Sequence, residues 1–357
     1  MRFRRSPRAS HVLWHRPGFS WSAARILGRR LLLRGLVLGV LAAGGLGAEP
    51  ASNGSATVSA TPSTTREPAS TSGPAPKSDT AERPVQTDPE QRLISLNPSL
   101  TAILVRLGGR ASLVGVDDYS GRVVEGVSEL PRVGGLFDPS LESIVALRPD
   151  RVLLVAGVDQ RSHAAQLERL GLEVEIYENE RLSEVLANIE RVGRLIGREE
   201  AAAARVRAIR AMVDAVAEAT AGRAEPRTLA VVDRSPLYLV GGETFLDEML
   251  VAVGARNLGR ALGSGYPRGS IEWLIEARPE LLIDMTPTTG EGDSGAAFWS
   301  RWPSLPAVAS GRVLTLDARR ISLPGPDLDR ALRELARAVH GDSIDSAIDA
   351  ALGASDS

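Results

Sequence analysis

Short apolar runs alternate with amphipathic segments along most of the chain after residue 92. Runs this short that are rich in Leu, Ile and Val are typical of buried parallel strands, and the segments between them have the spacing of helices. Strands are therefore expected at 93–96, 113–116, 152–155, 174–177, 228–233, 281–283 and 313–316. The alternation predicts an α/β fold built from parallel strand–helix units.

One pattern occurs twice, at an offset of 130 residues. Ser140 to Asp150 reads SLESIVALRPD, and Ser270 to Glu280 reads SIEWLIEARPE. In each copy the serine is suited to cap a helix, and the proline is suited to end that helix before a buried strand. The offset is too long for a solenoid, so the repeat predicts two lobes of similar build.

A helical connection is expected between the two lobes. Val185 and Ile189 begin a series of apolar residues at helical spacing, and Gly197 is a candidate break in it. The stretch 198–221 is rich in Ala, Arg and Glu, and as one helix it would be about 30 Å long or more. A helix joining two α/β lobes is a stiff connection, unlike a pair of extended strands.

The folded body therefore divides into four parts. We expect an N-terminal α/β lobe at 91–180, a connecting helix at 181–224, a C-terminal α/β lobe at 225–342 and a tail at 343–357.

The first 90 residues have a different composition. Residues 1–48 hold nine arginines and no acidic residue, and they end in an uncharged run of 14 residues. That run is shorter than the ~20 residues of a bilayer span and is typical of a signal peptide. Residues 49–90 are rich in Ala, Ser, Thr and Pro, which predicts a disordered tether. We expect export to the periplasm; the cleavage site, a twin-arginine route and retention of the leader as an anchor stay open.

Composition excludes several chemistries. The chain has no cysteine, so it has no disulfide, no thiol nucleophile and no thiolate metal site. Its four histidines leave little room for a histidine metal cluster or a catalytic triad. The leader holds nine of the 42 basic residues and none of the 44 acidic ones, so the rest carries a net charge of about −11. This balance argues against nucleic acid as a partner, because phosphate binding needs clustered positive charge.

Several stretches, taken in order, carry a family resemblance. They are 92–101 (RLISLNPSLT), 113–119 (LVGVDDY), 130–135 (LPRVGG), the repeat at 140–150, and 302–314 and 324–328 in the second lobe. Together they resemble the helical-backbone class of periplasmic substrate-binding proteins, which serve ABC importers for iron siderophores, haem and vitamin B12. The resemblance implies two Rossmann-like lobes joined by a long connecting helix, with a ligand cleft between the lobes.

The resemblance also implies a transporter partner. In relatives, one surface glutamate on each lobe docks to arginines of the permease dimer, and Glu142 and Glu272 occupy matching positions of the repeat. Charge complementarity of this kind steers docking. The alternative is that each acid merely favours the first turn of its helix through the helix dipole. The protein itself is expected to be a monomer.

Candidate ligand-binding residues are aromatic or cationic side chains in loops expected to face the cleft. They are Tyr119, Phe137, Tyr238, Tyr266 and Arg319. Flat aromatic faces suit a corrin, a porphyrin or an aromatic siderophore, and an arginine suits anionic ligand groups. Each aromatic side chain could instead pack onto its own lobe. Relatives that bind cobalamin tend to have tryptophan where this chain has Phe137 and Tyr266.

These observations favour an extracytoplasmic binding protein that delivers a corrinoid or a ferric siderophore to an ABC importer. Haem is the alternative ligand, since a tyrosine could serve as its axial ligand. We expect no catalytic residue, no metal site and no resident cofactor; cobalt or iron would arrive within the ligand. An exported enzyme or a scaffold on the same fold is the competing hypothesis. The sequence has no Gly-x-Ser-x-Gly motif, no metal-binding His pair and no glycine-rich phosphate loop to support an enzyme.

Overall fold

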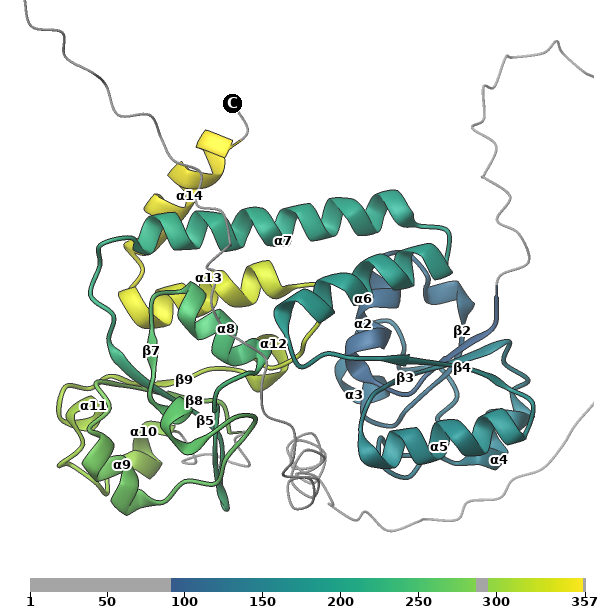
Figure 1. The fold of residues 1–357 in the computed structure, drawn as a ribbon, viewed down its shortest axis with the longest axis horizontal. Coiled ribbons are helices and arrows are strands. Elements are labelled where there is room, and N and C mark those ends of the chain that lie inside the picture. The colour runs from purple at the N-terminus through teal and green to yellow at the C-terminus, as the bar shows by residue number, and fades with distance from the viewer. Residues whose placement is uncertain (1–90, 287–294, 356–357) are drawn as a thin grey trace, which may run out of the picture. The chain divides into compact units, whose positions relative to one another are not determined.

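The computed structural model describes residues 91–286 and 295–355 (Figure 1). The expected leader and tether lie outside the described residues. The strands are β1 (Leu93–Ser95), β2 (Leu113–Val116), β3 (Arg151–Val155), β4 (Glu173–Tyr177), β5 (Arg227–Arg234), β6 (Leu237–Leu239), β7 (Arg256–Asn257), β8 (Leu281–Asp284) and β9 (Val313–Thr315). The helices are α2 (Pro98–Arg106), α3 (Ser120–Val123), α4 (Leu141–Ala146), α5 (Val158–Arg169), α6 (Leu182–Leu195), α7 (Glu199–Thr220), α8 (Phe245–Ala252), α9 (Ile271–Ala277), α10 (Gly295–Trp299), α11 (Pro306–Ala309), α12 (Ala318–Ile321), α13 (Leu328–His340) and α14 (Ile344–Ser355).

The strands form two separate sheets. The first has the order β2-β1-β3-β4 and is parallel throughout. The second has the order β6-β5-β8-β9, with β7 also paired to β5, and only the β5–β6 pair is antiparallel. The predicted α/β fold with parallel strands is confirmed.

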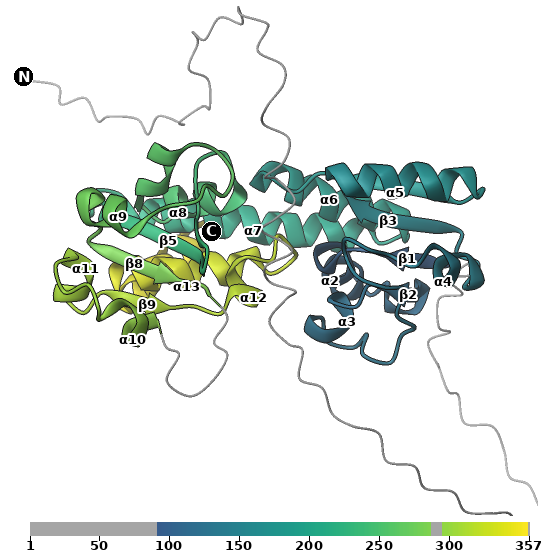
Figure 2. The ribbon, with the colours of Figure 1, turned by 90° about the horizontal axis from the view of Figure 1, so that it is seen from below.

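Alternate residues of each strand face different cores, because successive side chains of a strand point to opposite faces. In β1, Leu93 belongs to a core shared by both sheets, whereas Ile94 belongs to an outer core with α4 and α5. In β5, Ala230 faces the shared core, whereas Leu229 faces an outer core with α9, α10 and α11. Figure 2 shows α5 lying along β3 on the outer side of the first sheet, which it contacts. Strands with both faces covered explain the nearly continuous apolar runs of the sequence.

Two helices make the connection between the sheets. α6 and α7 pack on each other, and Gly197 separates them at a positive φ of 62°. α7 has 22 residues, which corresponds to about 33 Å. It also contacts α8, α13 and α14, so it packs on elements of the second sheet as well as on α6 (Figure 1).

The end of the chain corrects one expectation. The segment expected as a tail is largely the helix α14, which packs along α7. Ile344 and Ile348 are fully buried there, and Arg337 binds Asp345. Their spacing is that of an amphipathic helix, so the signal was present in the sequence. None of the described helices combines the length and the apolar run that crossing a membrane requires.

A loop between α12 and α13 ties the second sheet's elements to those of the first. The Ser99 hydroxyl at the start of α2 donates a hydrogen bond to the Pro324 carbonyl. Arg205 of α7 binds the Pro326 carbonyl and the carboxylate of Asp329. Only 12% of the Arg205 side chain is exposed, so this tie is largely shielded from water.

Candidate functional site

A buried polar network lies where β1 and β2 end. Asp117, which directly follows β2, accepts hydrogen bonds from the backbone N–H groups of Tyr119 and Ser120, both at 2.9 Å, and from the Ser120 hydroxyl. The Thr101 hydroxyl lies 2.8 Å from that of Ser95 and 3.1 Å from that of Ser120. Burial raises the pKa of Asp117, against the hydrogen bonds from Ser120 and Tyr119, which lower it. The network fixes the loop that carries Tyr119.

Tyr119 lies beside a cation: the Arg122 guanidinium is 5.8 Å from the centre of its ring. The side chain is half-buried, and burial raises the pKa of its hydroxyl, whereas the charge of Arg319 lowers it. Arg319 belongs to α12, which follows β9, and its guanidinium is held 3.1 Å from the Asp317 carboxylate. These two predicted ligand residues thus come from elements of different sheets, and the charge of Arg319 acts on the Tyr119 hydroxyl.

A second buried charge lies at the end of β8. The carboxylate of Asp284 forms an ion pair with Arg234 at 2.8 Å and accepts a hydrogen bond from the Trp299 indole at 2.6 Å. The Arg234 guanidinium lies 5.1 Å from the centre of the Phe298 ring. Sequence reasoning missed these residues, although the position of Asp284 directly after an apolar strand was a usable signal.

The other three predicted aromatic residues have different surroundings. Phe137 is half-buried in the turn that Gly134 and Pro139 close, and it does not belong to any of the three core clusters of the described residues. Tyr266 is half-buried against the shared core, where burial and the charge of Glu180 raise its pKa. Tyr238 is only 5% exposed in β6 and packs in the shared core, which leaves it little surface for a ligand.

The two copies of the repeat have the same local structure. Ser140 accepts a hydrogen bond from the Ser143 N–H at 3.2 Å, and Ser270 accepts one from the Trp273 N–H at the same distance. Ile144 anchors α4 and Leu274 anchors α9, and both are fully buried. Position by position, residues 141–150 and residues 271–280 fall into the same classes of buried, half-buried and exposed.

Glu142 and Glu272 are therefore held in the same way. Each is exposed in the first turn of its helix. A hydrogen bond from its own backbone N–H and one from the Ser270 hydroxyl lower the pKa of Glu272. Both helices begin beside the terminus of a strand. The Ser140 N–H donates to the Val133 carbonyl, and the Val133 N–H donates to the carbonyl of Val116, the last residue of β2. The Gly269 N–H donates to the carbonyl of Leu237, the first residue of β6.

The two copies are also tied to their sheets in the same way, through an arginine directly before β1 or at the start of β5. The backbone N–H of Arg92 donates to the Asp150 carboxylate at 2.7 Å, and that of Arg227 donates to the Glu280 carboxylate at 2.9 Å. Each of these arginines also donates from its guanidinium to a carbonyl at the end of the repeated helix. The acid that ends each copy therefore fixes its helix to its own sheet.

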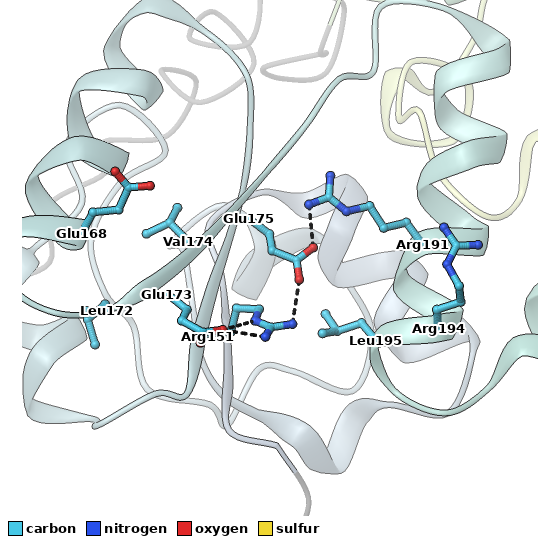
Figure 3. Close-up of a pocket in the computed structure, with 9 residues that line it drawn as sticks. All are labelled: Arg151, Glu168, Leu172, Glu173, Val174, Glu175, Arg191, Arg194 and Leu195. Atoms are coloured by element: carbon cyan, nitrogen blue, oxygen red, sulfur yellow. Dashed lines mark hydrogen bonds and ion pairs between the residues drawn. The ribbon is translucent and has the colours of Figure 1, made fainter.

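Two cavities lie away from the predicted ligand residues. One, of about 630 Å³, lies at β4, the edge strand of the first sheet (Figure 3). There Arg151 forms ion pairs with Glu173 and Glu175, and Arg191 forms one with Glu175. The other, of about 700 Å³, is lined by arginines and His340 at the end of α13. Within residues 91–286 and 295–355, no three acidic or histidine side chains converge as a metal ion would require.

Comparison with known proteins decides the family. The model of the family described as "Periplasmic binding protein" matches residues 93–320, which include both sheets. The chain belongs to this periplasmic binding protein family. Family membership indicates a binding protein that works outside the cytoplasm, and the relatives found are binding proteins, not enzymes.

Individual relatives share about a quarter of their residues with this chain. A vitamin B12-binding protein of Vibrio campbellii is 25% identical over 248 residues, which cover 69% of this chain and 88% of the relative. An uncharacterised ABC transporter substrate-binding lipoprotein of Bacillus subtilis is 27% identical over 263 residues, covering 71% and 81%. The crystal structure of a periplasmic haem-binding protein from Pseudomonas aeruginosa matches with a TM-score of 0.59 and 29% identity, covering 71% of this chain and 93% of that one. The likeness spans the folded body.

Proposed function

We propose that this protein captures a corrinoid or a ferric-siderophore ligand in the periplasm and delivers it to the permease dimer of an ABC importer. The observation that carries the proposal is the family match across both sheets. The relatives that bind vitamin B12 or serve an ABC transporter by name support the ligand class and the partner. The mechanism is binding and release, and metal enters only as part of the ligand.

The ligand binds, in this proposal, between the carboxyl ends of the two sheets, where ligands of open α/β sheets are generally held. Tyr119, Phe137 and Tyr266 are half-buried aromatic side chains with surface to offer a flat ligand. Arg319, whose side chain is exposed, meets anionic ligand groups. Tyr238 supports this surface from the core rather than lining it.

Glu142 and Glu272 serve as the docking residues of the two lobes. Both are exposed, and the repeated helix, its serine cap and its tie to the sheet hold them in the same way. Both helices begin beside strand ends, so a permease that binds them lies over the loops that hold the ligand.

Titration calorimetry on the purified chain tests the ligand. Cyanocobalamin, ferrichrome and haemin are titrated separately, and one-to-one binding of cyanocobalamin or ferrichrome is expected. Haemin binding that depends on Tyr119 or Tyr266, detected as loss of its Soret shift in the Phe variants, would move the assignment to haem. Binding of none of the three would overturn the ligand class.

Uptake in producing cells tests the delivery step. The Glu142→Gln/Glu272→Gln double variant is expected to keep its ligand affinity in the calorimeter and to lose uptake of that ligand. The matched control is Glu200→Gln/Glu218→Gln, which removes two exposed acids from α7 and should leave both properties unchanged. A docking variant that transports normally contradicts the assigned role of these acids.

A further inference from the structure

The repeated helices expose an apolar side chain at the same position. Val145 in α4 and Ile275 in α9 are each 42% exposed, and they are related by the 130-residue offset. Among the described residues only Leu170 and Val251 are comparable, at 55% and 47%, and neither lies in the repeat. A single exposed apolar residue is ordinary; here an apolar residue is exposed at the matching position of both copies.

The position of these residues follows from how each short helix is anchored. Ile144 and Leu274 are fully buried, so they turn the opposite side of α4 and α9 outward. Residues three apart are neighbours on a helix surface, which places Val145 beside Glu142 and Ile275 beside Glu272. Each copy thus presents one carboxylate next to one apolar side chain.

We propose that Val145 and Ile275 are the apolar anchors of the docking surface and that its occupant is a permease dimer that offers one matching patch from each subunit. This inference rests on the proposed function. The matching patch consists of a cation that meets the glutamate and an apolar side chain that covers Val145 or Ile275. A two-fold dimer repeats one patch twice, which is what a surface carrying two equal copies requires. The apolar contact excludes water around the ion pair and so strengthens it.

Cross-linking tests the identity of the occupant. The chain has no cysteine, so Val145→Cys, Ile275→Cys, Leu170→Cys and Val251→Cys each carry a single thiol for a benzophenone label. The labelled proteins are loaded with whichever of cyanocobalamin and ferrichrome binds in the calorimeter and are irradiated with membranes from the producing cells. The products are identified by mass spectrometry. Positions 145 and 275 should capture the same permease polypeptide, and positions 170 and 251 should not. Capture of two different polypeptides, or equal capture from all four positions, overturns the proposal.

Affinity for that permease complex in nanodiscs tests the contribution of each anchor. Val145→Ser and Ile275→Ser should each weaken binding about five- to tenfold, by similar factors, through lost apolar burial. Leu170→Ser and Val251→Ser should not change it. If the double glutamate variant loses docking but the serine variants bind normally, the anchor role is wrong and the proposed function stands. If the glutamate variant also docks normally, the docking assignment and this inference fail together.

Discussion

Arg148 and Arg278 adopt the same left-handed backbone conformation, with φ angles of 46° and 48°. Arg148 comes one residue after the C-cap of α4, and Arg278 is the C-cap of α9. Each precedes a proline. Helices often end in this conformation, but the residue there is usually glycine, because a side chain costs about 1–2 kcal/mol. The two copies of the repeat thus share a locally unfavourable choice of residue as well as a fold.

Replacing either arginine by glycine should therefore stabilise the protein. Arg148→Gly and Arg278→Gly are each expected to raise the free energy of unfolding by about 1 kcal/mol, because glycine adopts positive φ without a steric penalty. Urea denaturation followed by circular dichroism measures the change. Arg169→Gly makes the same substitution at the last residue of α5, which has a right-handed helical backbone. It should instead lower the free energy of unfolding by up to about 1 kcal/mol. Equal effects at all three positions would contradict the account.

The buried carboxyl group of Asp117 should give the stability a distinct pH dependence. Its pKa is raised by burial, so the folded chain keeps this proton to a higher pH than the unfolded chain does. The stabilisation is then fully present below the unfolded pKa of about 3.9 and is lost as the pH rises through the folded value. Asp117→Asn removes this dependence, so the free energy of unfolding of the wild type relative to the variant should fall as the pH rises above about 4.

Denaturation curves at a series of pH values measure that difference. Ser120→Ala provides the control, because it removes a hydrogen bond that lowers the pKa of Asp117. The pH range over which the stabilisation is lost should then move to higher pH. A difference between wild type and Asp117→Asn that grows with pH would show that the group behaves as an ordinary paired carboxylate.

Much of the fold could be predicted because its signals are local. Continuous apolar runs mark strands covered on both faces, and Ser140 and Ser270 each mark a helix start that the structure shows as a capped N-terminus. β6 was not predicted, since the chain turns back after β5 and pairs Leu237 with Arg234. That reversal buries Tyr238, which the sequence pattern had placed in a loop.

The candidate site was predictable only in part. Aromatic residues after strands can be found in the sequence, but whether they are buried depends on contacts distant in the chain. Arg234 meets Asp284 across 50 positions, and the charge of Arg319 lowers the pKa of Tyr119 across 200. Neither pairing leaves a local pattern. The apolar positions Val145 and Ile275 stand out only when both copies are compared together with their exposure.

The contact between the connecting helices depends on a missing side chain. A Cβ atom at Gly193 of α6 would lie 2.3 Å from the Ala202 Cβ of α7, too close for two carbon atoms. Gly193→Ala should therefore cost about 1–3 kcal/mol through overpacking, despite the better helix propensity of alanine. Gly353→Ala in α14 is the matched control, because nothing lies within 4 Å of its Cβ position. The free energy of unfolding of that variant, measured by thermal denaturation, should rise by up to about 1 kcal/mol. A rise in both variants would contradict the close approach of α6 and α7.

Arg205 should be the most important single tie between α7 and the start of α13. Its guanidinium is largely shielded and binds both the Pro326 carbonyl and the Asp329 carboxylate. Arg205→Leu leaves those acceptors without their donor and is expected to cost about 2 kcal/mol. Arg207→Leu, two residues along α7 at an exposed position, should stay within about 0.5 kcal/mol. Hydrogen exchange adds a local readout: in Arg205→Leu, the amides of Arg330 and Ala331 in the first turn of α13 should exchange faster than in the wild type. Unchanged exchange there, with the stability lost elsewhere, would mean that Arg205 supports α7 rather than the link between the two sheets.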